Sequence, residues 1–126
     1  MKKFEKWFKS AEEDLFIIKN IIALEDTPVK QCCYHAQQAA EKYIKAYLVA
    51  RNKEFPKTHD LQKLLKICLN LNPRFEEIFA IAFRLSDFGV DTRYPDGFDD
   101  LILSDAQQAY KNAITIKEFI LKYFFD

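Results

Sequence analysis

The chain contains very little glycine. Glycine occupies 2 of the 126 residues, whereas β-sandwiches, barrels and dinucleotide-binding folds need it at many of their turns. Hydrophobic residues make up 49% of the chain and 12 residues are phenylalanine, which excludes a disordered chain. At this length we expect one domain, residues 1–126, with a single core.

Cysteine is also scarce, and its pattern excludes a disulfide scaffold. The chain has 3 cysteines, an odd number in which Cys32 and Cys33 are adjacent, and this indicates a reducing, cytoplasmic setting. The cysteines and the two histidines, His35 and His59, lack zinc-finger spacing, so no metal or other cofactor is predicted. Cys32 and His35 lie near each other on one predicted helix, where packing is a far commoner role than thiol–imidazole catalysis.

The formal net charge of the chain is zero, because 19 basic residues balance 19 acidic ones. The chain therefore lacks the overall field that a general nucleic-acid binder carries. The charges are unevenly placed, with seven basic and three acidic side chains at 41–66 but two basic and eight acidic ones at 76–105. This separation favours a partner or self-association. The apolar run at 15–24 contains Lys19 and Asn20 and is too short to span a bilayer, so no membrane association is expected.

Apolar side chains recur every three or four residues through most of the chain, which predicts amphipathic helices. Five such helices are predicted: at residues 3–24 and 29–51, from just after Thr58, from 73 to near 89, and from just after Ser104 to the end. The second helix is rich in alanine on one side, so it is expected to lie at the centre of a helical bundle. No strand is predicted, and residues 89–103 form one longer insert.

Residues that cap a first helical turn mark the helix starts. Asn72 followed by Pro73 combines a capping side chain with proline at the first helical position. Thr58 is the predicted cap of the third helix, and Ser104 is expected to form a capping box with Gln107 at the start of the last. On the fourth helix, Phe83 is predicted to belong to the apolar face.

Two sets of polar side chains are candidate anion contacts. His59 lies in "THDL" at a helix start, where backbone N–H groups favour anions; its alternative role is local packing or hydrogen bonding beside the helix cap. A polar stripe on the second helix consists of Gln38, Glu41, Lys42 and Lys45. The lysines either face a phosphate, or the stripe is a solvated face in which Glu41 pairs with Lys45 one helical turn away.

The segment "GVDTRYPDG", residues 89–97, contains both glycines and departs from the helical pattern. Arg93 is suited to phosphate, because its planar guanidinium can donate two hydrogen bonds at once. Tyr94 can stack on a base, and Asp91 can orient Arg93. The structural alternative stays open: Arg93 pairs with nearby aspartates while Tyr94 and Pro95 pack over the end of the bundle.

Four motifs, in this order, resemble the HEPN domain family of bacteria and archaea. They are "W-x3-A-x2-DL" at 7–15, "AQQAAEKYIKAYL" at 36–48, "THDL" at 58–61 and "DTRYPD" at 91–96. The likeness extends from Trp7 to the last helix and implies an up-and-down bundle of four or five helices that forms a homodimer. It also implies binding of a nucleotide or RNA, often beside a separately encoded minimal nucleotidyltransferase in a toxin–antitoxin-like pair.

The ribonuclease motif of that family is not found in this chain. HEPN ribonucleases carry R-x4-6-H, and no histidine follows Arg51, Arg84 or Arg93 at that spacing. In related toxins a tyrosine just after the motif can be adenylylated, and Tyr94 is only loosely comparable because the motif before it is missing. The resemblance therefore leaves enzymatic activity open.

The leading hypothesis from the sequence is a HEPN-type module that binds a nucleotide or RNA. Its candidate site residues are Arg93, Tyr94, Asp91, His59, Lys42 and Lys45. One alternative is a non-enzymatic protein-interaction module that uses the acidic insert and the aromatic tail "FILKYFF", residues 119–125. The other is a degenerate HEPN ribonuclease.

Overall fold

The computed structural model of the chain describes residues 1–86, 88 and 101–125. In chain order its helices are α1 (Lys3–Ile21), α2 (Val29–Ala50), α3 (Leu61–Leu71), the 3-10 helix η1 (Pro73–Ile78), α4 (Phe79–Ser86) and α5 (Leu103–Lys122). The described ranges contain no strand, and the prediction of an all-α helical bundle is confirmed. Across those ranges, every helix is too short or too polar to cross a bilayer.

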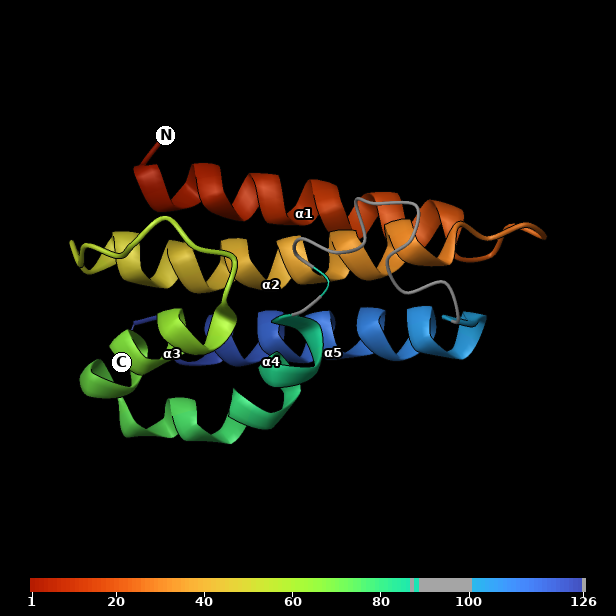
Figure 1. Cartoon of the computed structure of the whole chain (residues 1–126). Coiled ribbons are helices and arrows are strands. Elements are labelled where there is room, and N and C mark those ends of the chain that lie inside the picture. The colour runs from red at the N-terminus through yellow and green to blue at the C-terminus, as the bar shows by residue number, and fades with distance from the viewer. Residues whose placement is uncertain (87, 89–100, 126) are drawn as a thin grey trace.

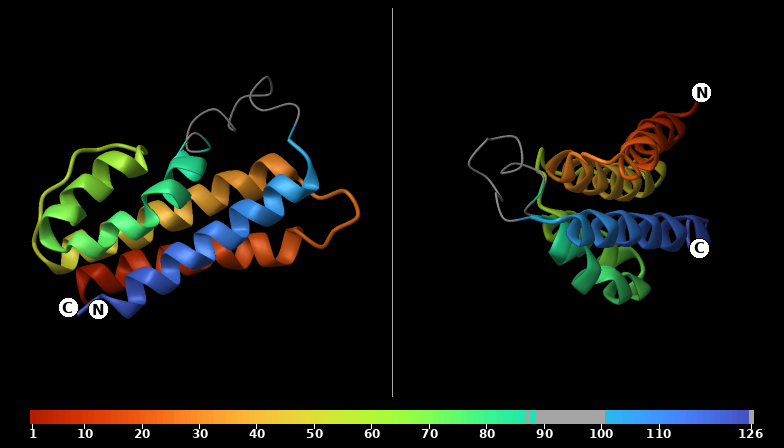
Figure 2. Two further views of the ribbon diagram at one scale, coloured as in Figure 1. Left: turned by 90° about the horizontal axis from the view of Figure 1, so that it is seen from below. Right: turned by 90° about the vertical axis from the view of Figure 1, so that its right-hand side faces the viewer.

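Three long helices form the body of the bundle (Figure 1). α2 lies between α1 and α5 and packs against both. α1 runs antiparallel to α2, and α5 runs in the same direction as α2 (Figure 2). The short helices α3, η1 and α4 form a second layer beside α2 and α5, and the N-terminus lies at the same end of the bundle as the end of α5.

The centre of the bundle is the alanine-rich side of α2, as its sequence predicts. Ala36, Ala39 and Ala40 are fully buried, and such small side chains let neighbouring helices approach closely. Large rings fill the space at the end where α2 finishes. The Phe75 ring lies 4.6 Å from the Tyr47 ring, centroid to centroid, and 5.1 Å from the Phe119 ring. Burial of each large ring contributes about 1.5–3 kcal/mol to folding.

The start of α3 differs from the prediction by two residues. Asp60 is the capping residue, since its carboxylate accepts a hydrogen bond from the Gln62 N–H at 3.0 Å. Thr58 supports this cap instead of forming it, because its hydroxyl accepts from the Asp60 N–H at 3.0 Å. The Leu61 N–H donates to Ser86 Oγ at 2.9 Å, which ties the first turn of α3 to the end of α4.

The start of α5 also differs from the prediction. The helix begins at Leu103, so Ser104 lies inside it and is not the capping residue of a box with Gln107. The reason is the carboxylate of Asp105, which accepts a hydrogen bond from the Ile102 N–H at 2.8 Å. A carboxylate in the first turn also interacts favourably with the positive end of the helix dipole.

The prediction that Phe83 faces the core is wrong. Asn72 does cap the helical segment as expected, accepting from the Arg74 N–H at 3.0 Å. The first six residues are a 3-10 helix, which turns every three residues instead of every 3.6. The faces of α4 are therefore rotated relative to a continuous α-helix, so that Ala82 and Leu85 are buried while Phe83 is 67% exposed.

The aromatic tail is partly core, because Phe119, Ile120 and Phe124 are buried while Leu121 and Phe125 are 47% and 89% exposed. Phe119 and Phe124 are 8% and 4% exposed, and the Phe124 ring packs 5.0 Å from the rings of both Phe4 and Phe8, centroid to centroid. The tail closes the bundle by packing on α1, where its aromatic area is removed from water.

α2 ends without a glycine. Asn52 adopts a φ of 54°, the left-handed conformation that asparagine tolerates better than most residues. The Lys53 N–H then donates to the Leu48 carbonyl oxygen at 3.0 Å. The chain reverses at this point and returns along α2 as the segment of residues 51–60 (Figure 1).

Candidate functional site

The polar stripe of α2 is enclosed by protein, so its interpretation as a solvated face is wrong. Gln38, Glu41 and Lys45 are 9%, 4% and 8% exposed. α1 covers this region on one side, and the segment 51–60 folds back over it on the other. The predicted pair of Glu41 and Lys45 does form, with 2.8 Å between Lys45 Nζ and Glu41 Oε2.

Glu41 is the centre of one polar cluster. Its Oε1 lies 2.8 Å from His59 Nδ1 and accepts a hydrogen bond from Gln37 Nε2 at 3.1 Å. Gln37 Nε2 also donates to the His59 carbonyl oxygen at 2.9 Å, so α2 holds both the ring and the backbone of His59. With Nδ1 donating to the carboxylate, Nε2 of a neutral ring is an acceptor. The His59 side chain is 42% exposed and can reach a ligand.

Lys45 is enclosed by two aromatic rings. Its ammonium nitrogen lies 5.6 Å from the ring centroids of both Trp7 and Phe55, and these two rings make an edge contact at 6.4 Å. Desolvated cation–π contacts of this kind stabilise an ammonium group by roughly 2 kcal/mol. The Lys45 charge is thus balanced inside the protein by Glu41 and the rings.

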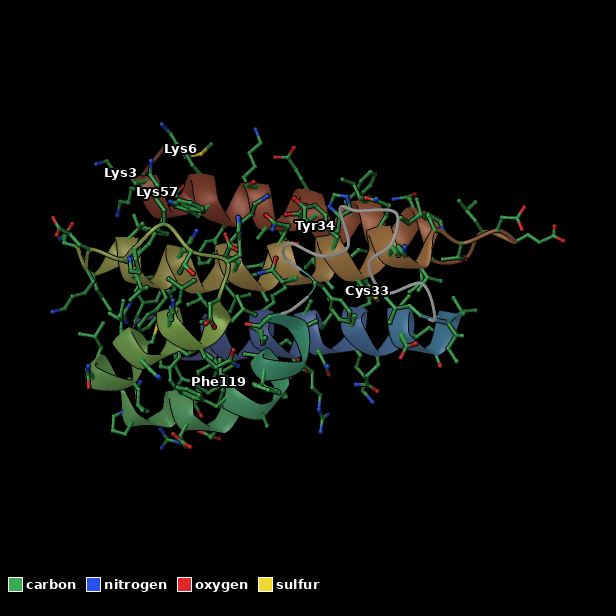
Figure 3. The ribbon with its side chains drawn as sticks, viewed as in Figure 1. Lys3, Lys6, Cys33, Tyr34, Lys57 and Phe119 are labelled. Atoms are coloured by element: carbon green, nitrogen blue, oxygen red, sulfur yellow. The ribbon has the colours of Figure 1, made fainter. Side chains whose placement is uncertain are left out.

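Asp14 is the centre of a second polar cluster, between α1 and α2. Its Oδ1 lies 2.7 Å from His35 Nδ1 and its Oδ2 accepts from Lys42 Nζ at 2.6 Å. Asp14 is 6% exposed, whereas the side chains of His35 and Lys42 are 21% and 22% exposed. The Tyr34 ring, which lies beside α1 in Figure 3, packs edge-on against His35 at 5.4 Å, centroid to centroid.

The two clusters have the same arrangement. In each, a buried carboxylate orients one histidine through Nδ1 and one lysine through Nζ. We call them together the α2 polar band, which consists of Asp14, His35, Gln37, Gln38, Glu41, Lys42, Lys45 and His59. The band follows α2 from residue 35 to 45, a span of roughly 15 Å at 1.5 Å per residue. Its partly exposed basic side chains are those of His35, Lys42 and His59.

Of the six candidate site residues from the sequence, His59, Lys42 and Lys45 lie in the α2 polar band. His59 and Lys42 reach solvent, while Lys45 is enclosed. The remaining three candidates, Asp91, Arg93 and Tyr94, lie outside the described residues.

Asp14, His35 and Gln37 belong to the band but were not site candidates from the sequence. One signal for Asp14 was available, because it lies three residues after Ala11 and four before Ile18, within the buried face of α1. An acidic residue at helical spacing within an apolar face needs a partner. The identity of that partner depends on tertiary packing, because His35 is 21 residues away in the chain.

Asp14→Asn is expected to destabilise the protein by about 1.5–3 kcal/mol, because hydrogen bonds from Lys42 and His35 to a charged carboxylate are lost. Urea unfolding followed by circular dichroism measures the effect. Glu13→Gln is the matched control, since Glu13 is the exposed neighbour on the same helix, and it should change stability by less than about 0.5 kcal/mol. Equal effects of the two changes would show that the Asp14 cluster contributes nothing.

The α2 polar band offers oriented N–H donors and imidazole nitrogens, which suit anions and proton transfer. Among the described residues, no group of three or more histidine, cysteine, aspartate or glutamate side chains is placed to hold a metal ion.

Comparison with known proteins places this helical arrangement in a family. The HEPN domain family model matches residues 4–123, and the chain belongs to the HEPN domain family. The crystal structure of ST0689, described as an archaeal HEPN homologue, is similar with a TM-score of 0.78 and 26% identity, covering 98% of this chain and 99% of that one.

A second solved structure shares the fold. The protein TT1696 from Thermus thermophilus is similar with a TM-score of 0.79 and 24% identity, covering 97% of this chain and 98% of that chain. A search of curated proteins gives no match. The family assignment therefore rests on the family model and on the archaeal homologue.

Proposed function

We propose that this HEPN domain binds the phosphate groups of a nucleotide or RNA along the α2 polar band. The observation that carries this proposal is the orientation of His35, Lys42 and His59 by two buried carboxylates. Charge-assisted hydrogen bonds to phosphate are among the strongest in proteins; Lys42 donates one through Nζ, and His35 or His59 donates one through Nε2 when its ring carries a proton on both nitrogens. Side chains that are already oriented lose little conformational entropy when they bind.

Lys42 and His59 are the described phosphate contacts in this proposal, and Lys45 acts through Glu41 by balancing its charge. Arg93, oriented by Asp91, adds a bidentate contact, and Tyr94 stacks on a base. These three residues come from the sequence alone.

Basic side chains extend the proposed surface to one end of the bundle. Lys3 and Lys6 of α1 and Lys57 of the segment 51–60 project at the end where Trp7 contacts Phe55 (Figure 3). Such lysines would contact successive phosphates of a longer RNA without reading its bases. This arrangement supports RNA as a ligand in addition to a mononucleotide.

The proposed partners follow from the family. A HEPN module of this size pairs with a minimal nucleotidyltransferase in a toxin–antitoxin-like system and forms a homodimer. The charge separation between residues 41–66 and 76–105 supports a complex in either case. Co-purification with a small nucleotidyltransferase, followed by mass spectrometry of Tyr94 for an added AMP, tests this part of the proposal.

Titration with ATP, AMP and a ten-nucleotide RNA at fixed salt tests the binding proposal. His59→Ala and Lys42→Ala are each expected to raise the Kd about tenfold, the loss of one charge-assisted hydrogen bond. Arg93→Ala removes two such bonds and is expected to have a larger effect. Calorimetry for nucleotides and fluorescence anisotropy for RNA measure the affinities.

The control for these titrations is Lys111→Ala, an exposed lysine on α5, which should leave every Kd unchanged. Binding that weakens equally in the Lys111 variant would point to nonspecific attraction and against the α2 polar band. The proposal fails if none of the ligands binds the unaltered protein. Metal-independent RNA cleavage that disappears in Arg93→Ala would support the degenerate ribonuclease instead.

A further inference from the structure

An open hollow lies at the end of the bundle where α1 begins and α5 ends (Figure 2). Its volume is about 490 Å³, which is within the range of pockets that hold small molecules. The lining comes from the start of α1, the end of α2 and the residues after α5, and includes Lys2, Phe4, Arg51, Phe124 and Phe125. None of these side chains belongs to the α2 polar band, so the hollow is a separate feature.

Arg51 is held in a fixed orientation where it lines this hollow. Its guanidinium carbon lies 3.7 Å from the centroid of the Tyr47 ring. Its Nη1 donates to the Tyr47 carbonyl oxygen at 3.5 Å, and its Nη2 donates to the Phe124 carbonyl oxygen. A guanidinium group has more N–H donors than these two bonds use. Arg51 is therefore an oriented cation that can still donate to a ligand.

The positive charge of Arg51 has no carboxylate partner within the described ranges, and neither has that of Lys2. By contrast, Lys42 and Lys45 of the α2 polar band each pair with a carboxylate. The carbonyl oxygens that orient Arg51 carry only partial negative charge. Arg51 is partly buried, and a charge that is withdrawn from water is costly without a partner. Two such cations on one hollow favour an anionic ligand.

Aromatic rings form the apolar part of the hollow. The Phe124 ring lies 5.0 Å from the Phe4 ring and 5.1 Å from the Phe125 ring, centroid to centroid. The Lys2 ammonium nitrogen lies 5.9 Å from the centroid of the Phe4 ring. Phe124 is buried, whereas the Phe125 ring is accessible to a ligand because it is 89% exposed. An accessible ring beside two cations suits a molecule that combines a flat ring with an anionic group.

We propose that this hollow binds a small aromatic anion, a flat ring that carries a phosphate or carboxylate group. The anionic group accepts hydrogen bonds from Arg51 and Lys2, and the ring packs against Phe125 and Phe4. The proposal goes beyond the proposed function and does not depend on phosphate binding at the α2 polar band. A nucleoside monophosphate and an aromatic carboxylate share this chemistry, and competition between them distinguishes the two.

Phenyl phosphate is the probe that tests whether the hollow binds such a ligand. Isothermal titration calorimetry is expected to give a Kd of about 1 mM or lower for a molecule of this size. Inorganic phosphate lacks the ring and benzyl alcohol lacks the charge, so each should bind at least ~tenfold more weakly. Binding of either one as tight as that of phenyl phosphate would overturn the proposal, as would no binding of phenyl phosphate.

Two-dimensional ¹H–¹⁵N NMR spectra locate the bound probe. Phenyl phosphate should shift the backbone amide signals of Phe4, Arg51 and Phe125. Shifts of Gln37 and Glu41 in addition would support the α2 polar band as a second phosphate site. Shifts of Gln37 and Glu41 without shifts at the hollow would overturn this proposal and leave the proposed function standing. The two proposals can therefore fail independently.

Single replacements test the contribution of each side chain. Phe125→Ala and Lys2→Gln change exposed side chains, so the fold should survive, and each is expected to raise the Kd about threefold to tenfold. Arg51→Gln is expected to raise it at least ~tenfold, with circular dichroism confirming the fold. Lys53→Gln is the matched control, because Lys53 is exposed just after α2 and should leave the Kd unchanged. Equal losses in Lys53→Gln, or none in Phe125→Ala and Lys2→Gln, would overturn the proposal.

Competition with phenyl phosphate identifies the class of anion, with the Phe125 amide signal as the readout. Displacement by AMP assigns the hollow to nucleoside monophosphates. Displacement by benzoate but not by AMP assigns it to aromatic carboxylates. Failure of both to displace the probe would contradict recognition through a ring and an anionic group.

Discussion

Glu41→Ala is expected to destabilise the protein by about 3–5 kcal/mol, because it leaves the buried ammonium of Lys45 without its counter-charge. Lys45 is 8% exposed and its nitrogen is enclosed by Trp7 and Phe55, so water cannot take the place of the carboxylate. The same change removes the acceptor for His59 Nδ1. Urea unfolding followed by circular dichroism gives the free energy.

A double replacement separates the charge effect from the loss of packing. Glu41→Met with Lys45→Met removes both charges and keeps similar side-chain volume between the aromatic rings, where methionine also packs well. Exchange of a complete buried ion pair for apolar residues is often close to neutral. The double variant should therefore be more stable than Glu41→Ala by several kcal/mol, and equal losses would show that the pair is not a coupled unit.

The second prediction with a large expected effect concerns the reactivity of the buried cysteine thiols. Burial raises the pKa of Cys33 to about 12, with the nearby Cys32 and Asp105 adding to the rise. Burial also raises the pKa of Cys68 to about 12. At pH 8 the thiolate fraction of each is about a thousandfold smaller than for a cysteine of pKa 9.0. Since the thiolate is the reactive species, a disulfide reagent should modify these cysteines at least about a thousandfold more slowly in folded than in urea-unfolded protein.

The control for this measurement is a single exposed cysteine introduced by Lys63→Cys on α3, which should react at the ordinary rate in the folded protein. Fast modification of Cys33 or Cys68 under native conditions would show that the core opens readily.

The raised pKa values of Cys33 and Cys68 also determine how the stability of the protein changes with pH. The buried thiols are favoured in their neutral form, so this contribution is complete below pH 9 and is lost as pH rises towards 12.

The sequence predicts most of the fold because helical periodicity is a local signal. The alanines of α2 and the apolar residues of α1 and α5 repeat every three or four positions, and these helices lie where the pattern puts them. The exceptions are the helix starts, where local hydrogen bonds decide which residue caps the helix and which side chains face the core. Asp60 and Asp105 offer a carboxylate that satisfies a free N–H, and the 3-10 turn after Asn72 rotates the following face.

The candidate site is harder to predict because its contacts join distant parts of the chain. The i,i+4 pair of Glu41 and Lys45 is visible in the sequence, but its burial is not. Burial results from Trp7 and Phe55, which approach α2 from two segments. The partnership of Asp14 with His35 likewise requires knowing how α1 lies on α2.

The start of α3 is hydrogen-bonded to two other helices. His59 binds to α2, and the Leu61 N–H donates to Ser86 Oγ at the end of α4. Ser86 lies seven residues before Arg93 in the chain. A ligand that displaces the His59 ring from Glu41 therefore acts on a turn that is also hydrogen-bonded to the end of α4.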